Sequence, residues 1–172
     1  MIKLAGAALL LFGTAGFSFS ICREQRERLR LLKNLKYMYQ LLQNEICYTG
    51  LPLPEIFRSI SEKLETPLKE ALLEVSQSMT WEQGKSLREV WESKISICLK
   101  GLPLTEIQKE LLLKFPECTG ISEREGQAKM LERYVRETDR YILQLETEEK
   151  SRNKVIMSLG IAAGIFIIII LL

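Results

Sequence analysis

Apolar residues recur in the middle of the chain at alternating intervals of three and four positions, which is the spacing of one face of an α-helix. One such stripe consists of Leu32, Leu35, Tyr39, Leu42 and Ile46, and a second of Leu131, Tyr134, Val135, Thr138, Ile142 and Leu145. Alternating runs of β-branched residues and Asn-Gly turns, the usual marks of strands and hairpins, do not occur. The pattern therefore predicts an all-α protein.

Shorter amphipathic segments between the two stripes carry start and stop signals of their own. Pro54 and Pro67 stand where a helix begins, and Gly50 and Gly101 stand where one ends. In a capping box, a Ser or Thr and the Glu or Gln three positions later cap each other's backbone N–H groups. The sequence has three, at Ser86–Glu89, Thr105–Gln108 and Ser122–Glu125. These signals predict a compact helical bundle over residues 23–154.

Two stretches that lack charge, except for Lys3, flank this bundle at residues 1–22 and 155–172. A bilayer core of about 30 Å is crossed by roughly 17–25 helical residues, so each stretch is long enough for a transmembrane helix. The first could instead be a signal peptide, but it lacks an A-x-A cleavage site and its basic flank lies on the wrong side. We therefore expect two uncleaved spans. No helix breaker separates them from the bundle, so we expect its first and last helices to be long, continuous with the spans, and adjacent.

Basic residues lie on the inner flank of both stretches, from Arg23 to Lys36 and at Lys150, Arg152 and Lys154. Because Lys and Arg mark the cytoplasmic ends of membrane helices, we expect a cytoplasmic bundle with both termini outside. The net charge of +2 is too small to indicate nucleic-acid binding. Topology and attraction to anionic lipid headgroups explain the basic residues at 23–36 instead.

Residue types that carry catalysis or bind metal ions are scarce. The chain has no histidine, the commonest metal ligand, and its four cysteines are not spaced as CxxC. Gly84-Lys85-Ser86 resembles the end of a phosphate-binding loop, but Met79 stands where that motif needs glycine. We therefore expect no enzymatic activity, no metal and no cofactor. We interpret the cysteines as reduced, buried apolar residues.

The two tryptophans have different expected roles. Trp91 shares a helix face with Leu87 and Ile95, which predicts a core position. Trp81 lies in an expected loop, where a tryptophan can anchor a protein–protein interface.

The terminal stretches contain glycines that suit close packing of helices. Gly160 and Gly164 form a GxxxG motif, in which missing side chains let another helix approach. Gly6, Gly13 or Gly16 of the first span could supply the facing surface.

One segment of the chain occurs twice. ICYTGLPLPEI (46–56) and ICLKGLPLTEI (97–107) agree at eight of eleven positions, 51 residues apart. Each combines a helix end, a glycine stop, a proline and a new helix start. An internal duplication would explain the match, but the similarity fades on both sides. We favour two helix–loop–helix corners that use the same local chemistry.

Several short motifs occur in order along the whole chain. They are the N-terminal membrane segment, Glu45-Ile46 with Tyr48, Pro52-Leu53-Pro54-Glu55, Trp91, Leu111-Leu112 with Phe115, Gly120 with Glu123, Glu125 and Gln127, and Ser158-Leu159-Gly160 with Gly164. Through their combined spacing between two membrane helices, the chain resembles the stage III sporulation protein AB family of endospore-forming bacteria. It departs from the family pattern at Pro116 and Thr119, where the family tends to have Gly and Leu.

This resemblance implies a place in the channel between mother cell and forespore, in the mother-cell membrane. The expected partners are a cytoplasmic secretion-type ATPase, other channel membrane proteins and the lipid bilayer. The role also allows a homo-oligomer. The bundle is expected to be similar to the helical domain of inner-membrane platform proteins of type II secretion and type IV pilus machines. Such a platform passes force from the ATPase into the membrane, whereas the alternative, a static scaffold, only recruits partners.

The expected docking residues lie on caps and loops, where partners tend to bind. They are Trp81, Arg124, Glu125 and Gln127.

Overall fold

The computed structural model describes the backbone over residues 2–81, 84–119 and 123–171, and side chains over 23–81, 84–119, 123, 125–151 and 155. The described residues form helices and no strand, which confirms the all-α prediction. The helices are α1 (Ile2–Tyr48), α2 (Leu53–Ser61), α3 (Leu68–Trp81), α4 (Leu87–Leu99), α5 (Glu106–Leu113), α6 (Pro116–Thr119) and α7 (Arg124–Leu171).

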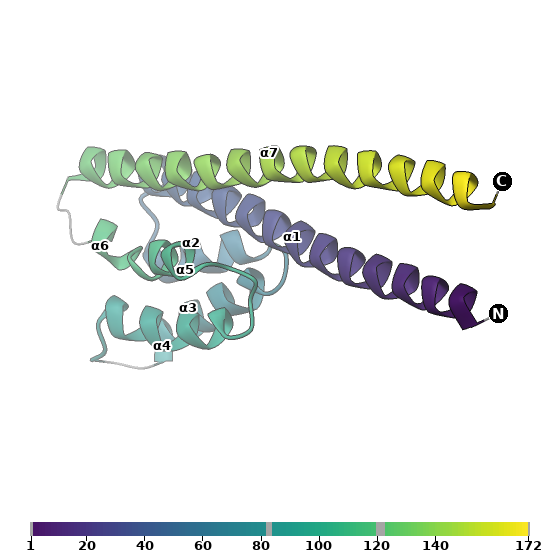
Figure 1. Cartoon of the computed structure of the whole chain (residues 1–172). Helices are drawn as coiled ribbons and strands as arrows, with labels where there is room; N and C mark the ends of the chain where they lie inside the picture. Colours follow the sequence, from purple (N-terminus) through teal and green to yellow (C-terminus); the bar gives the residue numbers. More distant parts are fainter. Residues whose placement is uncertain (1, 82–83, 120–122, 172) are drawn as a thin grey trace.

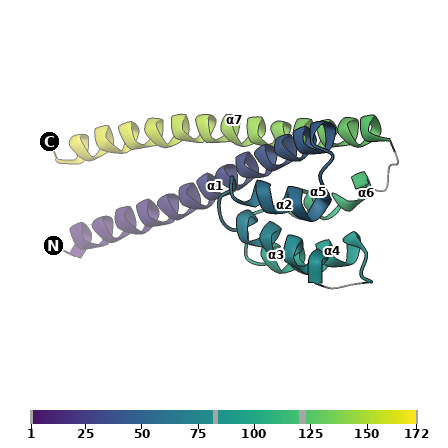
Figure 2. The same cartoon turned by 180° about the vertical axis from the view of Figure 1, so that it is seen from behind.

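Two long helices, α1 and α7, form one side of the molecule. They lie side by side over the bundle and diverge toward the termini, which are at the same end (Figure 1). The view from behind shows the same arrangement, with α2 and α5 beneath the long pair and α3 and α4 in a layer beyond them (Figure 2). Both long helices run without interruption from a terminal stretch into the bundle. Their predicted length, continuity and adjacency are thus confirmed.

Over the residues that the structure describes, none of the helices has the length and apolarity that a membrane crossing requires.

The predicted spans fall on segments whose side chains, apart from Val155, are outside the described residues. The same is true of Gly13, Gly16, Gly160 and Gly164, so the packing predicted for these glycines remains a prediction.

A cluster of aromatic side chains occupies the centre of the bundle. Trp91, Phe57 and Phe115 are fully buried, and the ring centroids of Trp91 and Phe115 are 4.5 Å apart. The Trp91 Nε1–H donates a hydrogen bond of 2.9 Å to the carbonyl oxygen of Leu112. This bond satisfies the one polar atom of the indole, as a buried tryptophan requires. The core position predicted for Trp91 is therefore confirmed.

Local start and stop signals act as the sequence indicates. Both capping boxes that the structure describes in full, Ser86–Glu89 and Thr105–Gln108, are formed reciprocally. Gly50 and Gly101 follow helix ends with φ of 63° and 81°, a conformation that favours glycine. The third predicted box includes Ser122, which is outside the described residues.

The two similar corners differ in where their second helix begins. In the second corner, the Thr105 hydroxyl accepts a hydrogen bond from the backbone N–H of Gln108, and α5 begins at Glu106. The matching position of the first corner is Pro54, which has no hydroxyl, and α2 begins two residues earlier in the motif, after Pro52.

The matching isoleucines of the two corners also have different surroundings. Ile46 and Ile56 are buried, whereas Ile97 and Ile107 are 63% and 65% exposed. These differences favour shared local chemistry over duplicated tertiary roles. The bundle covers α5 through Leu111 and Leu112 rather than through Ile107.

Two smaller expectations need correction. Trp81 is the last residue of α3 rather than part of a loop, although its side chain is 82% exposed, as expected for a contact residue. Among the described cysteines Cys118 is buried, but Cys47 and Cys98 are only half-buried. Both lie near the end of a helix, and Cys98 packs against the core.

The two tryptophans provide a matched test of the core. Replacing Trp91 with Phe should lower the free energy of unfolding by about 1–3 kcal/mol, because it leaves a gap and removes the donor to the Leu112 carbonyl. The same change at exposed Trp81 should stay within about 0.5 kcal/mol. Urea unfolding of the full chain in detergent, followed by circular dichroism, measures both values. Equal losses from the two variants would contradict the assigned core.

Candidate coupling interface and partner surface

The α1–α7 interface joins the two long helices in antiparallel register. From the terminal side inward, Arg26 faces Glu149 at 3.8 Å and Lys33 faces Glu146 at 2.8 Å, while Lys36 pairs with Asp139. Further along, the rings of Tyr39 and Tyr134 have centroids 5.4 Å apart. Nearer the distal end, Gln43 Nε2 donates to the carbonyl oxygen of Ala128 at 3.4 Å. Contacts between α1 and α7 therefore extend from Arg26 and Glu149 to Gln43 and Ala128, beside the buried apolar stripes of the two helices.

The ion pairs and the apolar stripes make different contributions to this interface. Exposed ion pairs contribute little stability each, since water screens them. Burial of the predicted stripes, including Leu32, Leu35, Leu42, Leu131 and Ile142, supplies most of the attraction. The charges instead favour one register, because a shift along the helix would separate each Lys or Arg from its carboxylate. A hydrogen bond from Lys33 and its positive charge lower the pKa of Glu146 below the usual carboxyl range.

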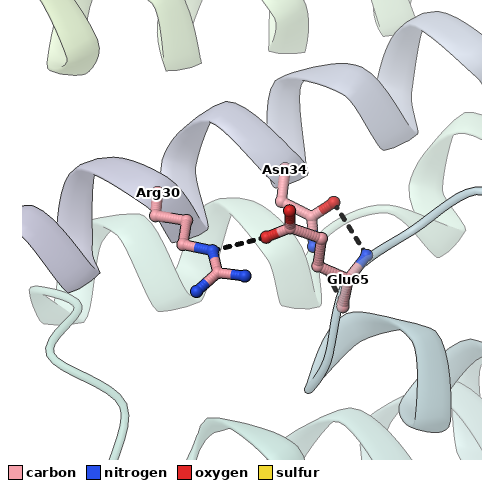
Figure 3. A network of polar contacts seen from close by, with 3 residues as sticks. All are labelled: Arg30, Asn34 and Glu65. Carbon is pink, nitrogen blue, oxygen red and sulfur yellow. Dashed lines mark hydrogen bonds and ion pairs between the residues drawn. The ribbon is translucent and has the colours of Figure 1, made fainter.

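A polar network on α1 fixes the connection between α2 and α3 (Figure 3). Asn34, only 9% exposed, donates from Nδ2 to the Glu65 carbonyl oxygen at 2.9 Å and accepts from the Glu65 backbone N–H at 3.3 Å. The Arg30 guanidinium donates from Nε to the Glu65 carboxylate at 2.6 Å, which raises the pKa of Arg30. Sequence reasoning missed Asn34. The signal that could have identified it was an asparagine directly beside Leu35, a residue of the apolar stripe.

Four basic side chains surround a hollow beside this network, which we call the basic hollow. Its volume is about 520 Å³, and its lining consists of Arg26, Leu29, Arg30, Lys33, Asn34, Tyr37, Lys63 and Glu65. It lies where α1 meets the turn after α2.

Of the predicted docking residues, Glu125 and Gln127 lie at the start of α7, at the end of the bundle opposite the termini (Figure 1). Glu125 pairs with Lys129 at 2.9 Å, and that contact lowers the Glu125 pKa. Gln127 lines a hollow of about 170 Å³ together with Leu51 and Thr119. Arg124 begins α7, but its side chain is outside the described residues.

The structure does not bring Trp81 to this place, because α3 lies in the layer beyond α2 and α5, away from α7 (Figure 2). The end of α1 lies beside the start of α7 instead, as the contact from Gln43 to Ala128 shows. Tyr48, the last residue of α1, is 85% exposed, and Leu51 of the following corner, 44% exposed, lines the hollow with Gln127. Sequence reasoning missed both as contact residues. We call Tyr48, Leu51, Glu125 and Gln127 the distal corner.

The described side chains offer little for catalysis or metal binding. No group of three or more His, Cys, Asp or Glu among them could hold a metal ion. Burial raises the pKa of the Cys98 and Cys118 thiols to about 11, so both are protonated at neutral pH and poor nucleophiles.

A helical bundle mounted on two paired long helices places this chain in the class of all-α proteins. The model of the family "Stage III sporulation protein AB (spore_III_AB)" matches residues 3–172. The chain therefore belongs to the stage III sporulation protein AB family, and the resemblance seen in its motifs is confirmed.

Known relatives agree with this assignment. The stage III sporulation protein AB of Bacillus subtilis (strain 168) is 28% identical over 172 residues, which cover 100% of both chains. A solved structure of a stage III sporulation protein AB superposes with a TM-score of 0.66 at 24% identity, over 73% of this chain and 98% of that one. That likeness shows a common fold.

A charge swap tests the α1–α7 interface. Lys33→Glu or Glu146→Lys alone should lower the melting temperature of the full chain, because each places like charges face to face. The double variant should recover most of the loss, and thermal unfolding measures all three. Failure of the double variant to recover stability would contradict the register.

The same pair predicts a dependence on pH. The pKa of Glu146 is lowered in the folded state, so its stabilising effect is present above the ordinary carboxyl pKa of about 4.3 and is lost as the pH falls through the lowered value. The stability difference between the parent and Lys33→Gln should therefore be seen at neutral pH and vanish on acidification.

Proposed function

We propose that the chain is a non-enzymatic platform in the bacterial inner membrane, part of the sporulation channel between mother cell and forespore. On this proposal it docks a cytoplasmic secretion-type ATPase and couples it to membrane and extracytoplasmic ring components. Its family membership supports a sporulation role, and the rest is our inference.

The continuity of α1 and α7 is the observation that carries the proposal. Each is one helix from a terminal stretch to the bundle, and the two are held together by paired charges and a buried seam. A continuous helix of 1.5 Å rise per residue transmits displacement along its axis without a joint. Movement imposed on the bundle would therefore reach both terminal stretches together.

The charge distribution supports the proposed topology. Residues 1–22 and 155–172 would be transmembrane helices, with the basic flanks on the cytoplasmic side and both termini outside. The bundle would then project into the cytoplasm, with the distal corner farthest from the membrane.

The distal corner is the proposed docking place for the ATPase. It combines exposed Tyr48 and the charged Glu125 with a hollow lined by Leu51 and Gln127, a mixture of apolar and polar groups expected of a protein-binding surface. It also joins the ends of both long helices, so a partner bound there would act on α1 and α7 at once. Trp81 on α3 is the second candidate surface.

Interrupting α7 tests whether movement passes along this helix from the bundle to the terminal stretch. A flexible Gly-Ser linker inserted at Asn153 should abolish sporulation while leaving the chain in the membrane, because it puts a joint between bundle and anchor. The same linker after Gly84 should be tolerated, since Gly84 lies between helices and a Cβ added there would meet nothing within 4 Å. Heat-resistant spore counts and membrane fractionation give the two readouts. Full sporulation with the Asn153 linker would favour a static scaffold.

Co-purification tests the docking surface. The combined change Tyr48→Ala and Glu125→Lys should reduce ATPase recovery with the full chain in detergent by about tenfold, as expected for loss of an interface anchor. Glu132→Lys is the matched control, because Glu132 pairs within α7 with Arg136 as Glu125 pairs with Lys129.

Trp81→Ala is tested beside these variants. ATPase loss from Trp81→Ala alone would move docking to the α3–α4 layer, and undiminished recovery with every variant would contradict both surfaces.

A further inference from the structure

Aromatic side chains from both long helices donate hydrogen bonds to the end of α5. The Tyr39 hydroxyl on α1 donates to the carbonyl oxygen of Leu111 at 3.3 Å. The Tyr134 hydroxyl on α7 donates to the carbonyl oxygen of Lys114 at 3.2 Å. We call residues 111–114 the capped turn, because side-chain donors cap its carbonyl groups.

The carbonyl group of Leu111 depends on its tyrosine. The last carbonyl groups of a helix have no intrahelical N–H partner. The two backbone N–H groups within reach of this carbonyl, those three and four residues later, donate to Glu110 and Leu112 instead. Leu111 is 7% exposed and Tyr39 is fully buried, so water has little access to the carbonyl oxygen. Because a buried carbonyl that loses its donor destabilises the fold, the hydrogen bond holds Tyr39 in one position against α5.

The capped turn is also held from the side of the shorter helices. Trp91 on α4 donates to the Leu112 carbonyl, and its ring packs on Phe115, which directly follows the turn. The Phe115 ring in turn contacts Phe57 on α2, with ring centroids 5.9 Å apart. The two long helices and the shorter ones are therefore attached to one another at this turn.

Hydroxyl bonds constrain the long helices in a way that their apolar stripes do not. Burial of apolar surface is non-directional, so a stripe tolerates a small rotation of its helix. A hydrogen bond weakens steeply when its angle or distance departs from the optimum. A tyrosine hydroxyl lies far from the helix axis, so it moves farther than the backbone when the helix turns. The bonds of Tyr39 and Tyr134 therefore fix the rotation of α1 and α7 against α5.

The short helix α6 connects the capped turn to the distal corner. The backbone N–H of Glu117 donates to the Lys114 carbonyl at 3.0 Å, so α6 is bonded to the turn itself. At the other end of α6, Thr119 lines the hollow that Leu51 and Gln127 share. A displacement at the distal corner would therefore reach the capped turn through one helix of 4 residues.

We propose that the Tyr39 and Tyr134 hydroxyls couple the two long helices to the shorter ones, by fixing the rotation of α1 and α7 against the capped turn. This inference deepens the proposed function, on which its functional part rests. It names the residues through which movement at the distal corner passes into both long helices. Removal of the two hydroxyls leaves the apolar stripes in place but frees the long helices to turn against α5.

Hydrogen exchange of the full chain in detergent, followed by mass spectrometry, tests the attachment. The combined change Tyr39→Phe and Tyr134→Phe keeps both rings and removes both hydroxyls. Peptides from residues 111–119 should then exchange about tenfold faster, the factor expected from two hydrogen bonds of ordinary net strength. The matched control, Tyr37→Phe with Tyr141→Phe, changes one tyrosine on each long helix whose hydroxyl makes no hydrogen bond among the described residues. It should exchange as the parent does, and unchanged exchange in the first variant would overturn the proposal.

Sporulation at matched stability separates coupling from a merely structural role. Ser76→Ala removes another hydroxyl-to-carbonyl bond, of 2.7 Å from α3 to Pro54 on α2, and leaves α1 and α7 untouched. The Tyr39→Phe, Tyr134→Phe variant should lower the count of heat-resistant spores at least tenfold at an unchanged amount of protein. Ser76→Ala should sporulate as the parent does, even where its melting temperature falls as far. Equal spore counts in the two variants, high or low, would overturn the coupling.

The linker at Asn153 distinguishes failure of this inference from failure of the proposed function. Full sporulation with that linker would overturn transmission as a whole, and the functional part of the inference with it. The exchange experiment would still decide whether the two hydroxyls hold the capped turn. Loss of sporulation with the linker, but not with the two tyrosine changes, would overturn the coupling alone.

Discussion

The antiparallel contact of α1 with α7 is the constraint on which the rest of the structure depends. The two helices come from opposite ends of the sequence, and every shorter helix is contained in the chain between them. The buried apolar residues between them, together with the contact of Tyr39 with Tyr134, hold the first and last helices of the bundle together. The Asn34–Glu65 hydrogen bonds then attach the α2–α3 connection to α1, and the Trp91 cluster fills the space beneath.

This arrangement separates the molecule into two regions with different chemistry. Near the terminal stretches the surface of α1 is basic, and its charges are shared between carboxylates of α7, the α2–α3 connection and the basic hollow. At the opposite end, the distal corner presents tyrosine and leucine beside the start of α7. The proposed platform would use this polarity, because anionic lipids attract positive charge and protein interfaces are built around apolar anchors.

The two Leu-Pro corners show which structural features local sequence determines and which it does not. Both copies stop a helix at a glycine with positive φ, because that conformation depends on the glycine itself and its neighbours. The second helix starts at different points, since only Thr105 offers a hydroxyl cap. The isoleucines at matching positions are buried in one copy and exposed in the other, because burial depends on which distant helix packs against them.

The sequence alone determined the helical class, the two long helices, the two described capping boxes and most of the core, because these follow from the spacing of apolar residues and from caps a few positions long. Family membership was also recognisable from motifs in order. Only the tertiary structure decided that Asn34 bonds the backbone of Glu65 and that Leu51 and Gln127 share a hollow while Trp81 lies in another layer. It also decided that four basic residues line one hollow. These groups bring together residues far apart in the chain. The spacing of apolar residues along one helix shows which of its faces is buried, but not which other helix packs against that face.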